Sequence, residues 1–398
     1  MTEPKGEKID HPNGACFNTT LPAPLPDEYK EVAWAIPSFD KATNQPKPIE
    51  PIWIARPNIG PNQVRFEMLY CGVCHSDTHC GNNDWGGCVY PFVGGHELLG
   101  KVTEIGEGVT KVKVGDLVGV GCMVDSCLKC QYCQNDEEQY CANGMTMTWN
   151  SPKTHGRVLG NPETYTHGGY SGSSVTHEHF IIKIPDSMDI QRAAPILCAG
   201  ITLWDPIRYH GLVDGPKKVV GVAGLGGLGT MGVKFASTLG HKVVAISTSA
   251  NKEFMAKEKG ATGFVVTTDP YSLKANAGTM DIIFNTISAN HDINTYLPLL
   301  KTGGTIVMLG GVAAPHTVYQ MGLMFQRKTI TGSLIGGVKA TQEVIDFCSK
   351  HSIYPDIKLI RARELNDTWK ALSEGKGDGV RFVIDVKASL EDESFLPK

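Results

Sequence analysis

The chain has 398 residues, which is long for one hydrophobic core, and its 41% hydrophobic residues supply enough apolar material for two. A formal net charge of −4 gives no electrostatic basis for binding nucleic acid or acidic lipid. No run approaches the roughly 18 apolar residues of a membrane span, and the first 30 residues lack a signal peptide's apolar core. We therefore expect a cytoplasmic protein that binds neither nucleic acid nor membrane.

The first part of the chain predicts a β-rich domain that follows a polar arm. Residues 1–30 are polar and rich in proline, which indicates an N-terminal extension. Short alternating runs with frequent glycine and proline then continue to about residue 195. Strands are predicted at 64–70, 100–106 and 116–120.

The pattern changes after Pro195, where short apolar strands alternate with helices. The predicted strands are 218–223, 241–246, 263–266, 281–285, 304–309 and 329–334, with helices at 230–239 and 251–259. This alternation predicts a parallel sheet with right-handed crossovers. A helix at 340–351 and a closing strand at 381–386 follow. The predicted fold class is α/β, a doubly wound parallel-sheet domain beside a β-rich domain.

The 12 cysteines include one tight group, Cys127, Cys130, Cys133 and Cys141. Without a secretory signal, metal ligation or free thiols are favoured over disulfides. Four thiolates within fifteen residues can close around one tetrahedral zinc ion and leave no open position, which predicts a structural site. The alternatives are an iron–sulfur cluster and four unrelated thiols.

Three further candidate ligands, Cys74, His96 and Cys198, lie far apart in the sequence. Two thiolates and one imidazole would leave a tetrahedral zinc ion one open position, as a catalytic site needs. Glu97 adjoins His96 and could orient the ligands or enter the coordination shell transiently. Each residue taken alone is weak evidence, because an isolated buried cysteine is usually only a small apolar side chain.

The residues around these positions resemble the zinc-containing medium-chain alcohol dehydrogenases, and within them the cinnamyl alcohol dehydrogenase branch. The resemblance covers roughly residues 32–390, in the family's order and spacing. The segments that carry it, besides the four-cysteine run, are 70–79 (YCGVCHSDTH), 83–86 (NDWG), 91–97 (PFVGGHE), 197–202 (LCAGIT) and 332–336 (GSLIG).

The resemblance implies a GroES-like catalytic domain formed by residues 31–195 and 338–398, and a Rossmann nucleotide-binding domain from 196 to 337. It implies two zinc ions per chain, one held by Cys74, His96 and Cys198 beside Glu97, the other by the four-cysteine run. Ser76 matches the hydroxyl that contacts the zinc-bound alcohol, and His79 matches the outer member of a proton relay. A homodimer through the nucleotide-binding domains is also implied.

A glycine-rich turn predicts where a dinucleotide binds. Residues 224–229 follow a strand, open a helix and fit G-x-G-x-x-G, so the backbone can approach a pyrophosphate at the helix N-terminus. The residues of this turn are Gly224, Leu225, Gly226, Gly227, Leu228 and Gly229. Further expected cofactor contacts are Thr202, Thr286, Gly310 and Ser333.

The segment after the second strand predicts NADP(H) as the cofactor. Enzymes that use NAD place an acidic residue there for the ribose 2′-hydroxyl, whereas this chain has Ser247, Thr248, Ser249 and Lys252. Hydroxyls and a lysine suit a 2′-phosphate. The alternative is that Ser247 caps the next helix and Lys252 is merely solvated.

Together these features predict a zinc-dependent oxidoreductase that moves hydride between NADP(H) and a small primary alcohol or aldehyde, aromatic or medium aliphatic. Aldehyde reduction is the expected direction. One alternative is an NAD-dependent polyol or formaldehyde dehydrogenase of the same superfamily. Another is a non-catalytic protein that binds zinc and nucleotide.

Overall fold

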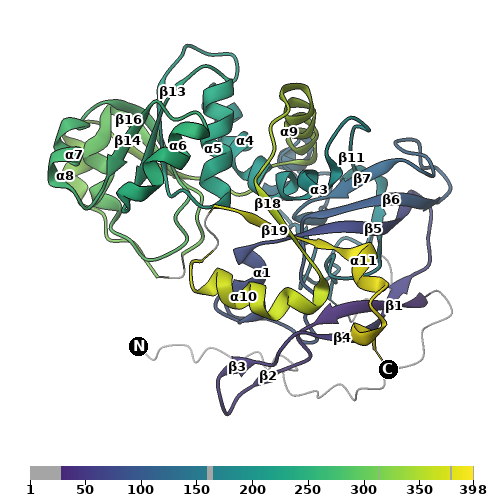
Figure 1. Cartoon of the computed structure of the whole chain (residues 1–398). Coiled ribbons are helices and arrows are strands. Elements are labelled where there is room, and N and C mark those ends of the chain that lie inside the picture. The colour runs from purple at the N-terminus through teal and green to yellow at the C-terminus, as the bar shows by residue number, and fades with distance from the viewer. Residues whose placement is uncertain (1–27, 159–164, 313, 377–378, 398) are drawn as a thin grey trace, which may run out of the picture.

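The structure is a computed structural model that describes residues 28–158, 165–312, 314–376 and 379–397. The predicted extension at 1–30 lies almost entirely outside the described residues. Figure 1 shows two sheets side by side, a green one with its helices and a blue one that the yellow C-terminal segment rejoins. No helix in the described ranges is long and apolar enough to span a bilayer.

The first sheet has the strand order of a dinucleotide-binding fold. Its strands, all parallel within the described residues, follow the order β14-β13-β12-β15-β16-β17, so the chain starts in the middle and reverses once. The central strands are buried along nearly their whole length, because helices cover both faces. The bounds are β12 Val219–Ala223, β13 Lys242–Ser247, β14 Gly263–Val266, β15 Met280–Asn285, β16 Leu300–Met308 and β17 Thr329–Gly332.

The helices of this part are α4 Ala199–Tyr209, α5 Gly227–Thr238, α6 Glu253–Glu258, α7 Pro270–Ala275, α8 Gln320–Met324 and α9 Val338–His351. Short 3-10 turns accompany them: η3 Ala194–Leu197, η4 Ala250–Lys252, η5 Ile293–Thr295 and η6 Leu297–Leu299. Helix α4 packs on both α5 and α9. The largest apolar cluster is continuous from Leu99 and Leu197 through α4 to Val222 and Phe284, so the two parts of the molecule share a packed boundary.

The second sheet is mainly antiparallel and mixes the two ends of the chain. Its order is β11-β7-β6-β5-β19-β18, with β10 also paired to β5 among the described residues. The late strand β19 pairs antiparallel to β5, which returns the C-terminal segment to the early strands. The bounds are β5 Gln63–Val73, β6 Leu98–Ile105, β7 Leu117–Val120, β10 Ser173–His177, β11 Ile182–Lys183, β18 Ile357–Ile360 and β19 Arg381–Asp385.

The remaining elements flank this second sheet. Strands β1 and β4 form a separate antiparallel ribbon. A buried ion pair supports it, because Arg56 on β4 donates to Glu31 on β1 at 2.7 Å. The bounds are β1 Glu28–Ala35, β2 Phe39–Asp40, β3 Gln45–Pro46, β4 Glu50–Pro57, α1 His75–Gly81, β8 Met123–Asp125, α2 Gln131–Gln134, η1 Glu138–Tyr140, β9 Thr146–Met147, η2 Glu178–Phe180, α3 Ile190–Ala193, η7 Ala362–Glu364, α10 Leu365–Ser373, α11 Val386–Leu390 and η8 Glu393–Phe395.

Every predicted strand and helix is present, most of them with shifted ends, and the strand at 263–266 matches β14 at both ends. Strand β5 runs on to Val73 and helix α5 begins at Gly227, three residues before the predicted start at Thr230. The predicted helix at 251–259 is shorter, because residues 250–252 form the turn η4 and α6 ends at Glu258. The predictions omitted the β1–β4 ribbon and helices α1, α4 and α10. Whether the domain boundaries fall at 195/196 and 337/338 stays a prediction.

Candidate functional site

Four buried side chains from three separate segments converge beside the second sheet. Cys74 precedes α1, His96 and Glu97 precede β6, and Cys198 precedes α4. Their ligand atoms all lie within 4.8 Å of one another. His96 Nε2 lies 3.2 Å from Cys198 Sγ, and Ser76 Oγ lies 3.7 Å from Cys74 Sγ. The structure thus brings together the three dispersed candidate ligands and the hydroxyl predicted to act beside them.

Asp77 holds this cluster in place, and the sequence analysis missed it. Its fully buried carboxylate accepts backbone N–H groups of Cys74 and Gly95, each at 2.9 Å, and the Tyr170 hydroxyl at 3.1 Å. Asp77 Oδ1 also lies 2.9 Å from His96 Nδ1. A proton on Nδ1 donated to Asp77 leaves Nε2 as the free lone pair that a metal needs. The acidic residue three positions after Cys74 was the available signal.

Glu97 faces the cluster with an oxygen that has no protein partner. Its Oε1 contacts Arg381 on β19, whereas Oε2 is buried without a hydrogen-bond partner among the described residues. A methyl group at Gly72 would fall 1.8 Å from Oε2, so glycine leaves the space for the carboxylate. Burial raises the pKa of Glu97 to about 7, against the opposing effect of Arg381. Glu97 is therefore placed to orient the ligands or to join them.

These residues fit a zinc ion held by Cys74, His96 and Cys198, with a fourth position that is open or taken by Glu97. Two thiols, an imidazole with a free Nε2 and an orphaned carboxylate oxygen form the soft, mixed donor set of a catalytic zinc site. A buried polar atom without a partner is costly in a dry interior, and a cation would satisfy Glu97 Oε2. The alternative of unrelated buried cysteines does not explain why the imidazole and carboxylate point at them.

The four-cysteine run forms a second cluster whose spacing fits a closed zinc site. All four Sγ atoms lie within 4.8 Å of one another, with Cys127–Cys133 at 3.9 Å and Cys130–Cys133 at 3.6 Å. A tetrahedral zinc with Zn–S bonds of about 2.3 Å places its sulfurs roughly 3.8 Å apart. Backbone N–H groups of Lys129 and Cys130 donate to Cys127 Sγ and lower the pKa of that thiol to about 5. The backbone of the loop therefore favours the thiolate form of Cys127.

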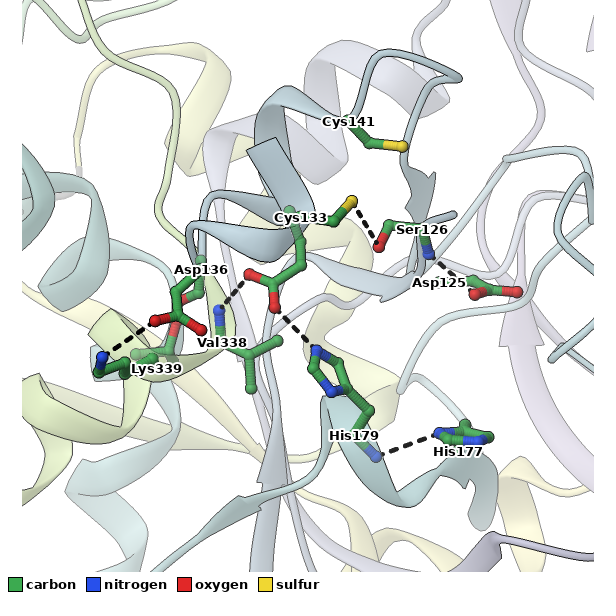
Figure 2. A network of polar contacts seen from close by, with 12 residues as sticks. Asp125, Ser126, Cys133, Asp136, Cys141, His177, His179, Val338 and Lys339 are labelled. Atoms are coloured by element: carbon green, nitrogen blue, oxygen red, sulfur yellow. Dashed lines mark hydrogen bonds and ion pairs between the residues drawn. The ribbon is translucent and has the colours of Figure 1, made fainter. Parts of the chain in front are cut away.

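This cysteine loop also fastens the start of α9. Glu138, between Cys133 and Cys141, accepts from the Val338 N–H at 3.1 Å with one oxygen and lies 2.7 Å from His179 Nε2 with the other. Lys339 pairs with Asp136 at 2.9 Å. Figure 2 shows Cys133 and Cys141 on the same lobe as these contacts to Val338, Lys339 and His179. The loop therefore supports the connection between the two sheets.

The glycine-rich turn lies at the point where the strand order of the parallel sheet reverses. Gly224 follows β12 with φ of 88°, in the left-handed region, and a side chain there would meet Thr286 Oγ1 at 2.8 Å. A methyl group at Gly229 would fall 1.9 Å from Gly224 O. Gly226 faces open space and is the N-cap of α5, so its backbone is free to approach a phosphate. Leu225, Gly227 and Leu228 complete this turn.

Thr286 closes the same turn from the next strand. It follows β15, and its hydroxyl donates to Ala223 O at 2.9 Å and Gly224 O at 3.1 Å. Gly310 packs closely against the residue after Thr286, because a methyl group on it would fall 2.1 Å from Ile287 O. Thr202 is buried in α4 and its N–H donates to Cys198 O at 3.0 Å, whereas the Ser333 hydroxyl donates to Asp205 at 3.3 Å.

Arg381 links the metal cluster to the glycine-rich turn. The side chain that contacts Glu97 also passes Gly227, where a methyl group would fall 2.3 Å from Arg381 Cδ. Its position at the start of β19 follows from the return of the C-terminal segment to β5. Arg381 is a second residue that sequence reasoning missed, since nothing nearby in the chain marks it.

Ser247 ends β13, and residues 248–252 follow directly. The Ser247 hydroxyl accepts the Ser249 N–H at 3.2 Å, and Thr248 O accepts the Thr268 hydroxyl at 3.1 Å. The Ser247 contact agrees with the alternative of a local turn cap, but it leaves the hydroxyl hydrogen free. Lys252 on η4 has no ion pair among the described residues. Position and chemistry both suit a phosphate at this corner.

His79 stands on α1 one turn after Ser76, at the edge of the site. Its Nδ1 lies 2.8 Å from Asp84 Oδ2, and its ring centroid lies 5.3 Å from that of Trp85. Both His79 and Asp84 are partly exposed, so a proton that reaches the imidazole can pass to solvent. The sequence motifs predict His79 but not its partner Asp84.

Replacing Asp77 with asparagine tests the hub of the metal cluster. The amide would place N–H groups against backbone donors and weaken the orientation of His96, so zinc affinity at this site should fall about 10- to 100-fold. Competition with a chelator, followed by metal analysis, measures it. The second zinc should be retained, and Asp84→Asn serves as the matched control with unchanged zinc affinity. Unaltered affinity in Asp77→Asn would contradict the assigned role.

Comparison with known proteins agrees with both the fold and the motifs. Residues 60–186 match the model of the alcohol dehydrogenase GroES-like domain, and residues 227–350 match that of the zinc-binding dehydrogenases. Cinnamyl alcohol dehydrogenase 8 of Arabidopsis thaliana is 46% identical, over 86% of this chain and 93% of its own length. 8-Hydroxygeraniol dehydrogenase of Catharanthus roseus is 45% identical, over 86% and 93%.

Solved structures give the same result. A cinnamyl alcohol dehydrogenase from Sorghum bicolor matches with a TM-score of 0.84 and 36% identity, covering 91% of this chain and 99% of that one. The Helicobacter pylori enzyme complexed with NADP(H) matches with a TM-score of 0.82 and 34% identity, with the same coverage. The chain therefore belongs to the zinc-containing alcohol dehydrogenase family, in its cinnamyl alcohol dehydrogenase branch, and is an alcohol dehydrogenase.

Proposed function

We propose that this alcohol dehydrogenase uses NADP(H) to interconvert primary alcohols and aldehydes, aromatic or medium aliphatic, and works mainly as an aldehyde reductase. The observation that carries the proposal is the metal-ligand cluster joined to the dinucleotide turn through Arg381, which contacts Glu97 and Gly227. A substrate oxygen at the cluster and a cofactor on the turn would then share one site. A cytoplasmic location also stays a prediction.

The residues suggest how each step is supported. When bound, zinc supplies a Lewis acid at the substrate oxygen and the dinucleotide supplies the hydride. Cys74, His96 and Cys198 would hold that zinc, with Asp77 fixing the imidazole. The Ser76 hydroxyl is placed to hold the proton of the substrate oxygen, and His79 with Asp84 to exchange it with solvent.

The cofactor preference rests on the absence of a carboxylate from residues 247–252, at the carboxyl end of β13. Ser247, Thr248 and Ser249 offer hydroxyl donors and Lys252 offers a positive charge. An acidic residue there would repel the 2′-phosphate and accept a hydrogen bond from an unmodified ribose. The solved relative from Helicobacter pylori is described as a complex with NADP(H). This supports NADP(H) for the present chain.

Substrate class is the least constrained part of the proposal. Relatives of similar identity are named for different substrates, including a probable mannitol dehydrogenase of Medicago sativa and a probable formaldehyde dehydrogenase of Bacillus subtilis, at 46% and 42% identity. A fold shared at this level does not decide among them. A polyol or formaldehyde substrate is therefore the second candidate.

A panel of aldehydes and polyols with NADPH and NADH tests the proposal directly. We expect NADPH oxidation with aromatic and medium aliphatic aldehydes, and loss of activity after removal of zinc by a chelator. Absorbance of the reduced nicotinamide follows the reaction. Preferred turnover of mannitol or formaldehyde with NAD would favour the second candidate. No turnover by protein that holds two zinc ions would favour a non-catalytic role.

Ser247→Asp tests the 2′-phosphate site. The new carboxylate should raise the KM for NADPH and lower that for NADH, with a shift in kcat/KM ratio of roughly tenfold or more, about 1.4 kcal/mol. Thr262→Asp, at the opposite end of the same sheet, adds the same charge away from the site and should leave the ratio unchanged. An unshifted ratio in Ser247→Asp would contradict the proposed phosphate position.

We also propose a homodimer through the nucleotide-binding part. Strand β17 is the last strand of the parallel sheet in the described chain, so its outer edge is open to pairing. The segment that precedes it in the chain carries Tyr319, Met324 and Phe325, which are 71%, 63% and 79% exposed. Exposed apolar side chains and an open strand edge favour a symmetric contact with a second copy.

The double change of Met324 and Phe325 to Asp should convert the dimer to a monomer. Two buried charges on each side of the contact would oppose association. Light scattering gives the mass directly. Phe254→Asp is the matched control, because Phe254 is 73% exposed on α6, away from this edge. A wild-type protein that already has the monomer mass would contradict the proposal.

A further inference from the structure

Two buried cysteines lie together outside both metal-ligand clusters. Cys80 is near the end of α1, and Cys88 follows the turn at residues 82–87. Their residues are only 6% and 4% exposed, and both belong to the apolar core of the antiparallel sheet. Neither belongs to the groups of possible metal ligands. The function proposed above does not use them.

Two asparagines hold these cysteines close to each other. The Asn83 N–H donates to Cys80 O at 2.8 Å, and Asn83 Oδ1 accepts from the Cys88 N–H at 2.9 Å. Asn150 Nδ2 donates to Cys80 Sγ at 3.3 Å, and Asn150 Oδ1 accepts from the Val89 N–H at 3.0 Å. Each asparagine thus ties Cys80 to the Cys88–Val89 segment, so the backbone that separates the cysteines is pinned at both ends.

The two thiols are also unequal. Their mutual interaction lowers the pKa of the Cys88 thiol and raises that of Cys80. Both are free thiols in the structure. The thiol with the lower pKa suits the attacking role in disulfide formation, and the other suits the resolving role.

We propose that Cys80 and Cys88 are an oxidisable dithiol that a peroxide converts to a disulfide. The Cys88 thiolate attacks the O–O bond, becomes a sulfenic acid and releases hydroxide, which takes up a proton. The Cys80 thiol then attacks the Cys88 sulfur, forms the S–S bond and releases a second water. One peroxide molecule is reduced to two waters as two thiols are oxidised to one disulfide. A dithiol reductant reverses the change.

The turn that covers the pair is suited to admit a small oxidant. Residues 84–87 are exposed, and Gly86 and Gly87 have no atoms of other residues within 4 Å of where a side chain would stand. The turn is therefore open to solvent at these two glycines, and hydrogen peroxide is small enough to approach the pair from this side.

Oxidation would act on the proton-relay residues. Cys80 directly follows His79, and the turn carries Asp84 and Trp85, which contact the His79 ring. A disulfide draws the sulfurs to about 2.05 Å and so shifts the end of α1 relative to the turn. We therefore expect reversible loss of aldehyde reduction when the disulfide forms.

Peptide mapping of the zinc-loaded enzyme tests the proposal. Protein treated with hydrogen peroxide is alkylated and cut by chymotrypsin, which cleaves after Trp85 and separates the two cysteines. The expected product is a pair of peptides, one holding Cys80 and one holding Cys88, that stay joined until reduction. Activity is measured in parallel, before and after a dithiol reductant.

Three single cysteine-to-serine variants show whether the effect depends on Cys80 and Cys88. Cys80→Ser and Cys88→Ser should retain basal activity, lack the joined peptides and lose the part of peroxide inhibition that reductant reverses. Cys348→Ser removes a buried thiol on α9 and should behave as the wild type. Separate alkylation of Cys80 and Cys88 after peroxide treatment would overturn the proposal. Joined peptides with unchanged activity would establish the disulfide and overturn its effect on the relay.

Discussion

The metal-ligand cluster depends on one buried carboxylate. Asp77 accepts hydrogen bonds from the backbone on both sides of the cluster, at Cys74 and Gly95, and holds the His96 ring by Nδ1. A fully buried negative charge is costly unless it is paired and hydrogen-bonded, and Asp77 is surrounded by four such contacts. This arrangement fixes the ligands before any metal arrives, which lowers the cost of ordering them on binding.

A second constraint fixes the metal-ligand cluster next to the glycine-rich turn. The C-terminal segment returns to pair β19 with β5, and this places Arg381 against Glu97 on one side and Gly227 on the other. The four-cysteine loop holds the start of the C-terminal segment, since Glu138 accepts a hydrogen bond from the first N–H of α9. The apparently peripheral loop and the late strand therefore both act on the relative placement of the two sheets.

The turn between α1 and the segment that leads to His96 carries several independent features. Asp84 pairs with His79, Trp85 packs on the His79 ring, and Cys80 and Cys88 lie on either side of the turn in the chain. Gly86 and Gly87 are exposed at its surface. A change that shifts this turn would therefore reach the residues that contact the His79 ring.

The amino-acid sequence alone is enough to predict the fold class, the strand–helix order after Pro195 and the family. Those features depend on local patterns: apolar periodicity, the glycine spacing of a phosphate-binding turn and cysteines close together in the chain. It also identified Cys74, His96 and Cys198 as a group, but only through the resemblance, because more than a hundred residues separate the first from the last.

Which distant residues meet follows from the three-dimensional fold alone. The roles of Asp77, Arg381 and Glu138 come from contacts between segments far apart in the chain. The placement of Cys80 near Cys88 depends on two asparagine bridges. Strand ends moved for the same reason: β5 runs on to Val73 because β19 supplies partners there. Hydrogen-bond partners across a sheet are set by the fold, so a local sequence pattern cannot reveal them.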